Sequence, residues 1–151
     1  MPIEQTTDLL EKLKNVHHDL AQCYEAQESD VKKDKVQLML NYLKEQEQNL
    51  AAAVEKFQKT GESKALSTYY SQSPDQEQWD FLASCRLTKD ISYEDLVQEV
   101  VKTGEAYIDI LEDIHTLSEM DSQKKIFKDL VDGATHTRNQ FIYNAMMLGD
   151  G

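Results

Sequence analysis

The sequence predicts an all-α protein in which four long helices pair as two hairpins. Only five Gly and two Pro occur in 151 residues, and Glu, Gln, Lys, Leu and Ala are abundant, which is a helix-forming composition. Four long stretches space their apolar residues three and four apart, so these side chains share one helix face. The crossover between the second and third stretches, residues 61–91, is far longer than the loops of an up-and-down bundle.

The first hairpin is predicted to consist of helices at residues 6–28 and 34–60. Side-chain oxygens of Thr6-Thr7-Asp8 can cap the backbone N–H groups at the start of the first helix. The core face of the first helix is predicted to contain Leu9, Leu13, Val16, Leu20 and Tyr24. The core face of the second helix is predicted to contain Met39, Leu43, Leu50, Ala53 and Phe57, with Gln46 between them. The polar connection is short, so the second helix should return antiparallel and end at a left-handed Gly61.

The crossover at residues 61–91 is predicted to be ordered. A short helix near Ala65 and Leu66 would stop before Pro74, and Trp79, Phe81 and Leu82 follow. A solvated linker would not contain this many large apolar residues, so the segment should pack against the bundle.

The second hairpin is predicted at residues 92–118 and 122–148. Ser92 is the expected cap of the third helix, and Ile91 can pack onto Leu96 as a hydrophobic staple. The predicted core residues are Val97, Val101, Gly104, Ile108, Leu111 and either Ile114 or His115, then Phe127, Leu130, Val131, Ala134, Phe141 and Ala145. Residues 1–151 form one predicted domain, long enough to bury a core without metals or disulfides.

The net charge and the cysteine content limit which classes of partner and which cellular location are expected. A net charge of −12 argues against binding nucleic acid or an anionic membrane surface, because phosphate contacts need clustered Lys and Arg. There is no signal-like start and no apolar run of membrane-spanning length, so the expected location is cytoplasmic. Cys23 and Cys85 form no CxxC motif and are expected to be unpaired, small, buried apolar residues.

Two segments give the chain a resemblance to a known superfamily. They are LMLNYLKEQEQNLAAAVEKF in the second helix and IFKDLVDGATHTRNQFIYNAMML in the fourth. With the hairpin–crossover–hairpin order, they make the chain similar to the ferritin-like superfamily, above all its rubrerythrin-like and bacterial stand-alone members. The resemblance implies a ferritin-like four-helix bundle. Active members hold two iron or manganese ions with a Glu from each of two helices and a Glu-x-x-His from each of the others.

The ligands that the resemblance implies are missing at the matching positions. The two Glu-x-x-His places fall at Gln46/Asn49 and Ala134/Thr137, and shifting the register by one residue supplies no pair in both helices. No inward Glu occurs in the core stripes of the first and third helices. We therefore expect no metal and no other cofactor, with iron or manganese as the alternative. Glu112 and His115 form the one Glu-x-x-His, a weak candidate because two ligands cannot hold a metal.

Other polar residues suggest structure more than chemistry. Gln46, Asn49 and Thr137 could form a hydrogen-bonded layer in the bundle centre, unless Asn49 faces outward. His17 and His18 point in different directions because they are adjacent on a helix. Cys23 has no activating partner in its own turn, and no GxGxxG, P-loop or GxSxG motif occurs. The chain is therefore not expected to be an enzyme.

The function predicted from the sequence is self-association or binding to another protein, most simply as a homodimer. Apolar residues beyond the core stripes (Val36, Leu40, Val54, Val100 and Tyr107) suggest a second contact surface. Leu38 and Tyr42, which flank the stripe of the second helix, are the interface candidates. The alternatives are an oxidase or peroxidase with an unusual dinuclear ligand set, and a small-molecule binder with a pocket where the metals would lie.

Overall fold

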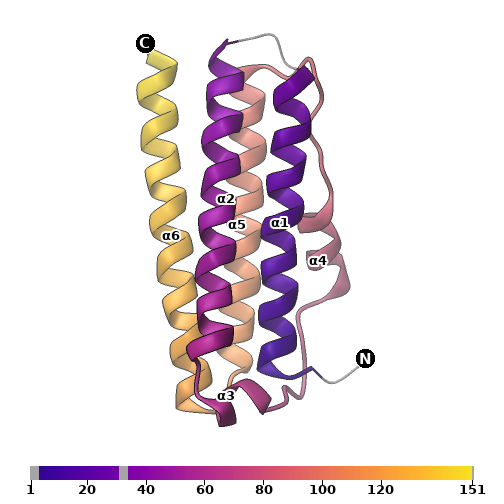
Figure 1. Cartoon of the computed structure of the whole chain (residues 1–151), viewed down its shortest axis with the longest axis vertical. Helices are drawn as coiled ribbons and strands as arrows, with labels where there is room; N and C mark the ends of the chain where they lie inside the picture. The colour runs from indigo at the N-terminus through magenta and orange to yellow at the C-terminus, as the bar shows by residue number, and fades with distance from the viewer. Residues whose placement is uncertain (1–3, 31–33, 151) are drawn as a thin grey trace.

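Four long helices lie side by side in the computed structural model, which describes residues 4–30 and 34–150 (Figure 1). One hairpin consists of α1 (Thr6–Asp30) and α2 (Asp34–Thr60), the other of α5 (Tyr93–Leu117) and α6 (Asp121–Asp150). The crossover contains two short helices, α3 (Ser63–Ser67) and α4 (Gln76–Ala83). The prediction of an all-α bundle of two hairpins is confirmed. In the described part of the chain, no helix has both the length and the apolar character to cross a bilayer.

The long helices begin and end within two residues of the predicted positions. The predicted cap of α5 is present, because Oγ of Ser92 accepts a hydrogen bond from the backbone N–H of Asp95 at 3.1 Å. Residues 31–33 of the predicted polar connection lie outside the described residues. Gly61 is not left-handed, since none of the described glycines has a positive φ. Glycine is needed there because a Cβ would lie 2.6 Å from the carbonyl oxygen of Phe57.

The core faces of α2 and α5 are wider than predicted. In α2, Ala53 is exposed while Ala51 and Val54 are buried. In α5, Val97 and Val101 are only half-buried, and the buried residues are Leu96, Thr103, Tyr107, Ile108, Ile110, Leu111 and Ile114. The crossover packs on α5 as well as the neighbouring long helices, so a second side of α5 is covered.

Most of the surplus apolar residues that suggested a second contact surface are used inside the chain. Val36, Leu40, Val54 and Tyr107 are all buried and belong to the one hydrophobic core cluster. Leu38 is different, with 61% of its surface exposed. The width of the apolar faces is therefore explained by packing within one molecule, and only the exposed apolar residues bear on association.

The crossover is ordered, as predicted. Its first part pairs with the beginning of α1 and the residues just before it. The backbone N–H of Thr6 donates to the carbonyl of Thr68 at 3.1 Å, and the N–H of Tyr70 donates to the carbonyl of Glu4 at 2.8 Å. The helix α4 then lies against α1 and α5, on the right in Figure 1. It buries Leu82 completely and leaves Trp79 only 7% exposed. This anchoring fixes the path by which the chain returns along α1.

A disulfide joins that returning segment to α1, and this corrects the prediction for the cysteines. Cys23 in α1 is bonded to Cys85, which follows α4, with a Cα–Cα distance of 5.9 Å. The two residues are 62 positions apart, so their pairing depends on the course of the crossover, which residue spacing alone does not reveal. Cys85 is also exposed and Cys23 half-buried, so neither is the buried apolar residue that was expected.

Candidate functional site in the bundle centre

A small cavity lies at mid-height between the two hairpins. The volume open to the centre of a water-sized sphere is about 50 Å³. One water molecule needs about 10–15 Å³ of such volume, so about four waters would fit. The apolar walls are Leu20, Leu43, Leu50, Val100, Val101, Ala134 and Phe141. The polar side chains are His17, Tyr24, Gln46, Glu47, Thr103, Tyr107, Thr137 and Arg138. A cavity that combines apolar walls with several polar side chains can hold a small ligand.

The central polar feature is a pair formed by His17 and Glu47. Nδ1 of His17 lies 2.6 Å from Oε2 of Glu47, and His17 is only 1% exposed. Because a carboxylate accepts hydrogen bonds, this contact places a proton on Nδ1. Nε2 of His17 is buried and has no hydrogen-bond partner among the described residues. An unpaired buried nitrogen costs about 1–3 kcal/mol, so this atom is free to receive a ligand group or water.

Two buried tyrosines stand beside this pair. The ring of Tyr107 meets the imidazole of His17 edge to face, with centroids 4.6 Å apart. Burial raises the pKa of the Tyr24 and Tyr107 phenols far above the ordinary value, and the charge of Glu47 raises it further. Both phenols therefore stay protonated. Each can donate a hydrogen bond to a group in the cavity.

Arg138 brings a second basic group to the cavity wall. It is half-buried, and its hydrogen bonds go to the side-chain oxygen of the adjacent Asn139 at 3.4 Å. No carboxylate of the described residues lies within ion-pair distance of its guanidinium. The cavity thus combines one carboxylate with two basic side chains.

The predicted polar layer is only partly assembled. Gln46 and Thr137 both line the cavity, and Nε2 of Gln46 donates to the hydroxyl of Tyr42 at 2.7 Å. Asn49 is exposed and does not line it, which agrees with the outward-facing alternative for this residue. Tyr42 is half-buried and also accepts a hydrogen bond from Asn144 of α6 at 3.0 Å.

The weak metal candidates lie elsewhere. Glu112 is exposed and His115 half-buried, and neither lines the cavity. Across residues 4–30 and 34–150, no group of three His, Cys, Asp or Glu side chains is placed to hold a metal ion. The structure therefore does not bring Glu112 and His115 together with a third ligand.

Sequence reasoning missed both His17 and Glu47. A signal for His17 was present, because Leu10, Leu13, His17, Leu20 and Tyr24 follow the three-and-four spacing of an inward face. Glu47 adjoins the predicted central residue Gln46, but which of two neighbours turns inward depends on the rotation of α2. Their pairing across two helices carries no signature in residue spacing.

Comparison with known proteins supports the fold and leaves the function open. No protein-family model matches the chain, and no curated protein sequence does so. A crystal structure from Thermotoga maritima, of a protein provisionally named a ferritin-like diiron-carboxylate protein, has a TM-score of 0.60 at 14% identity. The superposition covers 97% of each chain. The fold is therefore ferritin-like, and this similarity carries nothing further.

The dinuclear metal centre implied by the sequence resemblance does not fit these residues. Such a centre uses four carboxylates and two histidines from the facing helices. The cavity offers one carboxylate and one imidazole, and these are hydrogen-bonded to each other. Ala134 stands where the resemblance places a Glu of the fourth helix, and it has no ligand atom.

Purified protein is accordingly expected to contain far less than one iron, manganese or zinc ion per chain. The expectation rests on the missing carboxylates, and elemental analysis by mass spectrometry measures it directly. Two transition-metal ions per chain would contradict it. If such ions were retained in the double variant Glu112→Ala/His115→Ala, they would be bound in the cavity. If they were lost, they would be bound by Glu112 and His115 of α5.

Proposed function

We propose that this ferritin-like bundle binds a small organic acid in its central cavity. The observation that carries the proposal is Nε2 of His17, a buried nitrogen without a partner among the described residues. Glu47 fixes the proton on Nδ1, so neutral His17 presents a lone pair at Nε2. A carboxylic acid can donate its proton to that lone pair, and a carboxylate anion can bind there while Nε2 takes up a proton from the solvent. The resulting imidazolium and carboxylate are then hydrogen-bonded to each other.

The charges of the cavity favour an acid over an amine or a neutral molecule. With His17 neutral, the positive charge of Arg138 equals the negative charge of Glu47. A bound carboxylate adds a negative charge that a proton on Nε2 of His17 can balance, whereas a bound ammonium group would add a positive charge that no further carboxylate in the cavity lining balances. The hydroxyls of Tyr24 and Tyr107 can donate to the same oxygens, because both phenols remain protonated.

The size and walls of the cavity limit the remainder of the ligand. A volume of about 50 Å³ accommodates a molecule of roughly four to six heavy atoms. Leucine, valine and phenylalanine side chains form the apolar part of the lining, so the part of the ligand beyond the carboxylate should be hydrocarbon. Short aliphatic carboxylic acids meet both conditions.

Titration with butanoate, followed by heteronuclear NMR, tests this function. Saturable shifts are expected at His17 and the cavity walls, with a Kd on the order of 1 mM, typical of so small a ligand. Butylamine, which has the same hydrocarbon part and the opposite charge, should not compete. Ala134→Val should abolish binding by filling the cavity. Ala145→Val should preserve it, because Ala145 is buried in the same helix but does not line the cavity.

No saturable change with butanoate at roughly 50 times that Kd would contradict the proposal. Equal binding of butanoate and butylamine would also contradict it, since the charge argument would then fail. The metal-dependent oxidase or peroxidase alternative is not supported by this ligand set.

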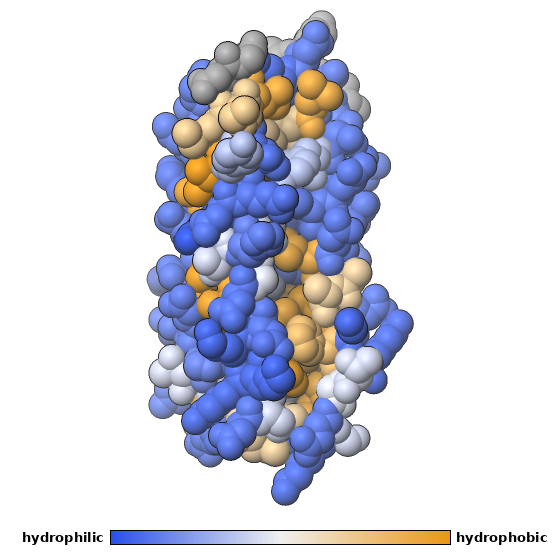
Figure 2. All heavy atoms as spheres, turned by 90° about the vertical axis from the view of Figure 1, so that its left-hand side faces the viewer, coloured by the Kyte–Doolittle hydropathy of each residue, from blue (hydrophilic) through white to orange (hydrophobic). Residues whose placement is uncertain are grey.

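Self-association as a homodimer is a second proposal, and exposed apolar side chains support it. Leu38 of α2 and Tyr143, Met146 and Met147 of α6 are between 59% and 63% exposed. Both segments lie at one end of the bundle, where Lys35 donates to the carbonyl of Gly149 at 3.2 Å. Figure 2, which views the molecule from the side on which α6 lies in Figure 1, shows apolar side chains near the upper end among hydrophilic ones. These exposed side chains could meet those of a second copy across a two-fold axis. A different protein partner is the other possible occupant.

Leu38→Glu combined with Met147→Glu is expected to convert a dimer into a monomer. Each change forces a charge into an apolar contact, while both residues are exposed within the single chain. Light scattering should show the mass halve with an unchanged circular dichroism spectrum. Tyr42 is unsuitable for this test because its hydroxyl joins α2 to α6. A parent protein that is monomeric at about 100 μM, well above the Kd of a stable dimer, contradicts the dimer.

Cytoplasmic location stays a prediction, and the disulfide argues against it. Reducing systems keep most cytosolic thiols unpaired, whereas disulfides persist in oxidising compartments. The bond between Cys23 and Cys85 would therefore be stable outside the cytoplasm or under oxidising conditions.

A further inference from the structure

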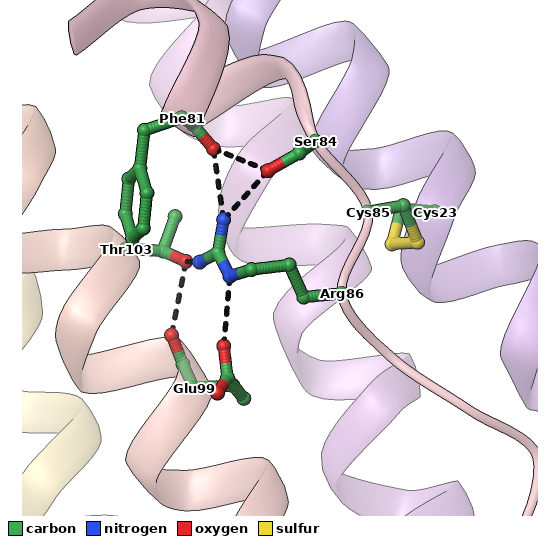
Figure 3. Close-up of a disulfide and its surroundings, with 7 residues drawn as sticks. All are labelled: Cys23, Phe81, Ser84, Cys85, Arg86, Glu99 and Thr103. Carbon is green, nitrogen blue, oxygen red and sulfur yellow. Dashed lines mark hydrogen bonds and ion pairs between the residues drawn. A yellow bond between two sulfur atoms is a disulfide. The ribbon is translucent and has the colours of Figure 1, made fainter. Parts of the chain in front are cut away.

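Residues 84–87, the strap, connect α4 to the segment before α5 and are fixed on two sides. Cys85 is bonded to Cys23 of α1, and the next residue, Arg86, reaches in the other direction to α5. Figure 3 shows the two anchors pointing to opposite sides of the strap. The strap therefore ties α1 to α5, which are the first helices of the two hairpins.

The Arg86 anchor is built from several contacts. Nε donates to Oε2 of Glu99 at 2.9 Å, and Nη2 donates to Oγ1 of Thr103 at 2.7 Å. Nη1 donates to the carbonyl of Phe81 at 2.8 Å, and the centroid of the Phe81 ring lies 3.9 Å from the guanidinium carbon. The hydrogen bond from Arg86 holds the pKa of Glu99 below its usual value, so this pair stays charged near neutral pH. This anchor does not depend on the disulfide for its chemistry.

The strap lies behind one wall of the central cavity. Leu20 and Tyr24 of α1, with Val100 and Thr103 of α5, line that cavity. The same four side chains also line a small void of about 10 Å³ whose other side is formed by the strap. The wall is thus one side chain thick, and the strap is what covers it. Cys23 borders this void as well, so the disulfide is directly at the wall.

We propose that the Cys23–Cys85 disulfide controls access to the central cavity, so that its reduction frees the strap from α1 and opens the wall between α1 and α5. The proposal rests on the proposed function in treating the cavity as a ligand site. With the bond intact, the strap holds both helices and the side chains around His17 stay packed. With the bond broken, the Arg86 anchor and the packing of Leu87 against the core remain, but the covalent link to α1 is lost, so Leu20 and Tyr24 can move away from Val100 and Thr103.

The chemistry requires a dithiol as the two-electron reductant. Cys85 is exposed and Cys23 half-buried, so an external thiolate reaches Sγ of Cys85 first. A mixed disulfide forms there while Cys23 leaves as a thiolate and takes up a proton. The second thiol of the reductant then attacks the reductant's sulfur in the mixed disulfide, and Cys85 is released as a thiol. The dithiol ends as a cyclic disulfide, so two electrons and two protons have moved to the protein.

Modification of His17 by diethyl pyrocarbonate tests the access that this proposal describes. The reagent reacts with an unprotonated imidazole nitrogen, and His17 is only 1% exposed, so modification of Nε2 requires the packing around His17 to open. Modification of each histidine is followed by peptide mass spectrometry in the oxidised parent, in parent reduced with dithiothreitol and desalted, and in Cys23→Ser/Cys85→Ser. Reduction and the double substitution should each raise the His17 rate about tenfold or more, as local opening becomes easier. The exposed His18 and His136 should react at unchanged rates.

Hydrogen exchange separates opening of the wall from loss of the whole fold. The backbone amides of Leu40 and Leu43, in the core of α2, should exchange far more slowly than His17 is modified. The proposal is overturned if reduction leaves the rate of His17 modification unchanged. It is also overturned if His17 is modified only as fast as the core amides exchange, because the whole fold would then be opening. Neither result depends on ligand binding. If butanoate binds but the rate of His17 modification does not change on reduction, only the proposed control by the disulfide is contradicted. If the rate of modification rises but butanoate does not bind, only the proposed ligand function is contradicted.

Discussion

Replacing Cys23 and Cys85 together by Ser is expected to lower the free energy of unfolding by about 4 kcal/mol. The bond joins residues 62 positions apart, and closing a loop of this length removes that much chain entropy from the unfolded state on the loop-closure model. The strap also loses its attachment to α1, but the Arg86 contacts to α5 do not involve either sulfur.

Urea denaturation of the oxidised parent, the reduced parent and the double variant measures this loss. The reduced parent should unfold at nearly the same urea concentration as the variant, because both lack the same bond. A difference below about 1 kcal/mol between oxidised parent and variant would show that the disulfide adds little to the stability of the fold.

Trp79→Ala is expected to destabilise the protein by about 3–5 kcal/mol, the usual loss for a large buried aromatic side chain. Trp79 lies in α4 and is only 7% exposed, although α4 belongs to a crossover and not to the four long helices. The ammonium group of Lys12 in α1 lies 5.3 Å from its ring centroid. Removing the ring therefore weakens the attachment of the crossover to α1.

Phe81→Ala is the matched control for this change. Phe81 is in the same helix but 38% exposed, so its replacement should cost clearly less than that of Trp79. As Trp79 is the sole tryptophan, the emission of the parent protein reports its surroundings and should shift to the red on unfolding. A loss below about 1 kcal/mol for Trp79→Ala, with parent emission typical of an exposed indole, would mean that the crossover is loosely attached.

The long helices could be predicted from the sequence because their signals are local. Apolar spacing of three and four residues places the elements, and Ser92 marks the start of α5 in the same way. The rotation of each helix was less predictable, as Ala53 and Val54 show: which neighbour is buried depends on every surface that packs against α2. Tyr107 was assigned to an intermolecular face for the same reason, before the crossover was known to widen the core of α5.

The candidate site was less predictable because it depends on contacts between distant residues. The resemblance placed Gln46 and Thr137 at the bundle centre, and both line the cavity. The pairing of His17 with Glu47 and the bond between Cys23 and Cys85 each join residues at least 30 positions apart. Such pairs have no periodicity. Three-dimensional packing alone identifies them, so both were absent from the sequence-based expectations.

The account depends most on the state of His17, and nitrogen-resolved NMR of the imidazole side chains tests it most directly. Spectra of the parent, assigned with His17→Gln, should show His17 protonated at Nδ1 with an unprotonated Nε2, and the Nε2 signal should move towards the protonated position on addition of butanoate. His18 and His136 are exposed and serve as internal references that should not respond. A His17 signal that is unaffected by butanoate, or one that shows Nε2 bound to a metal ion, would contradict the proposed function.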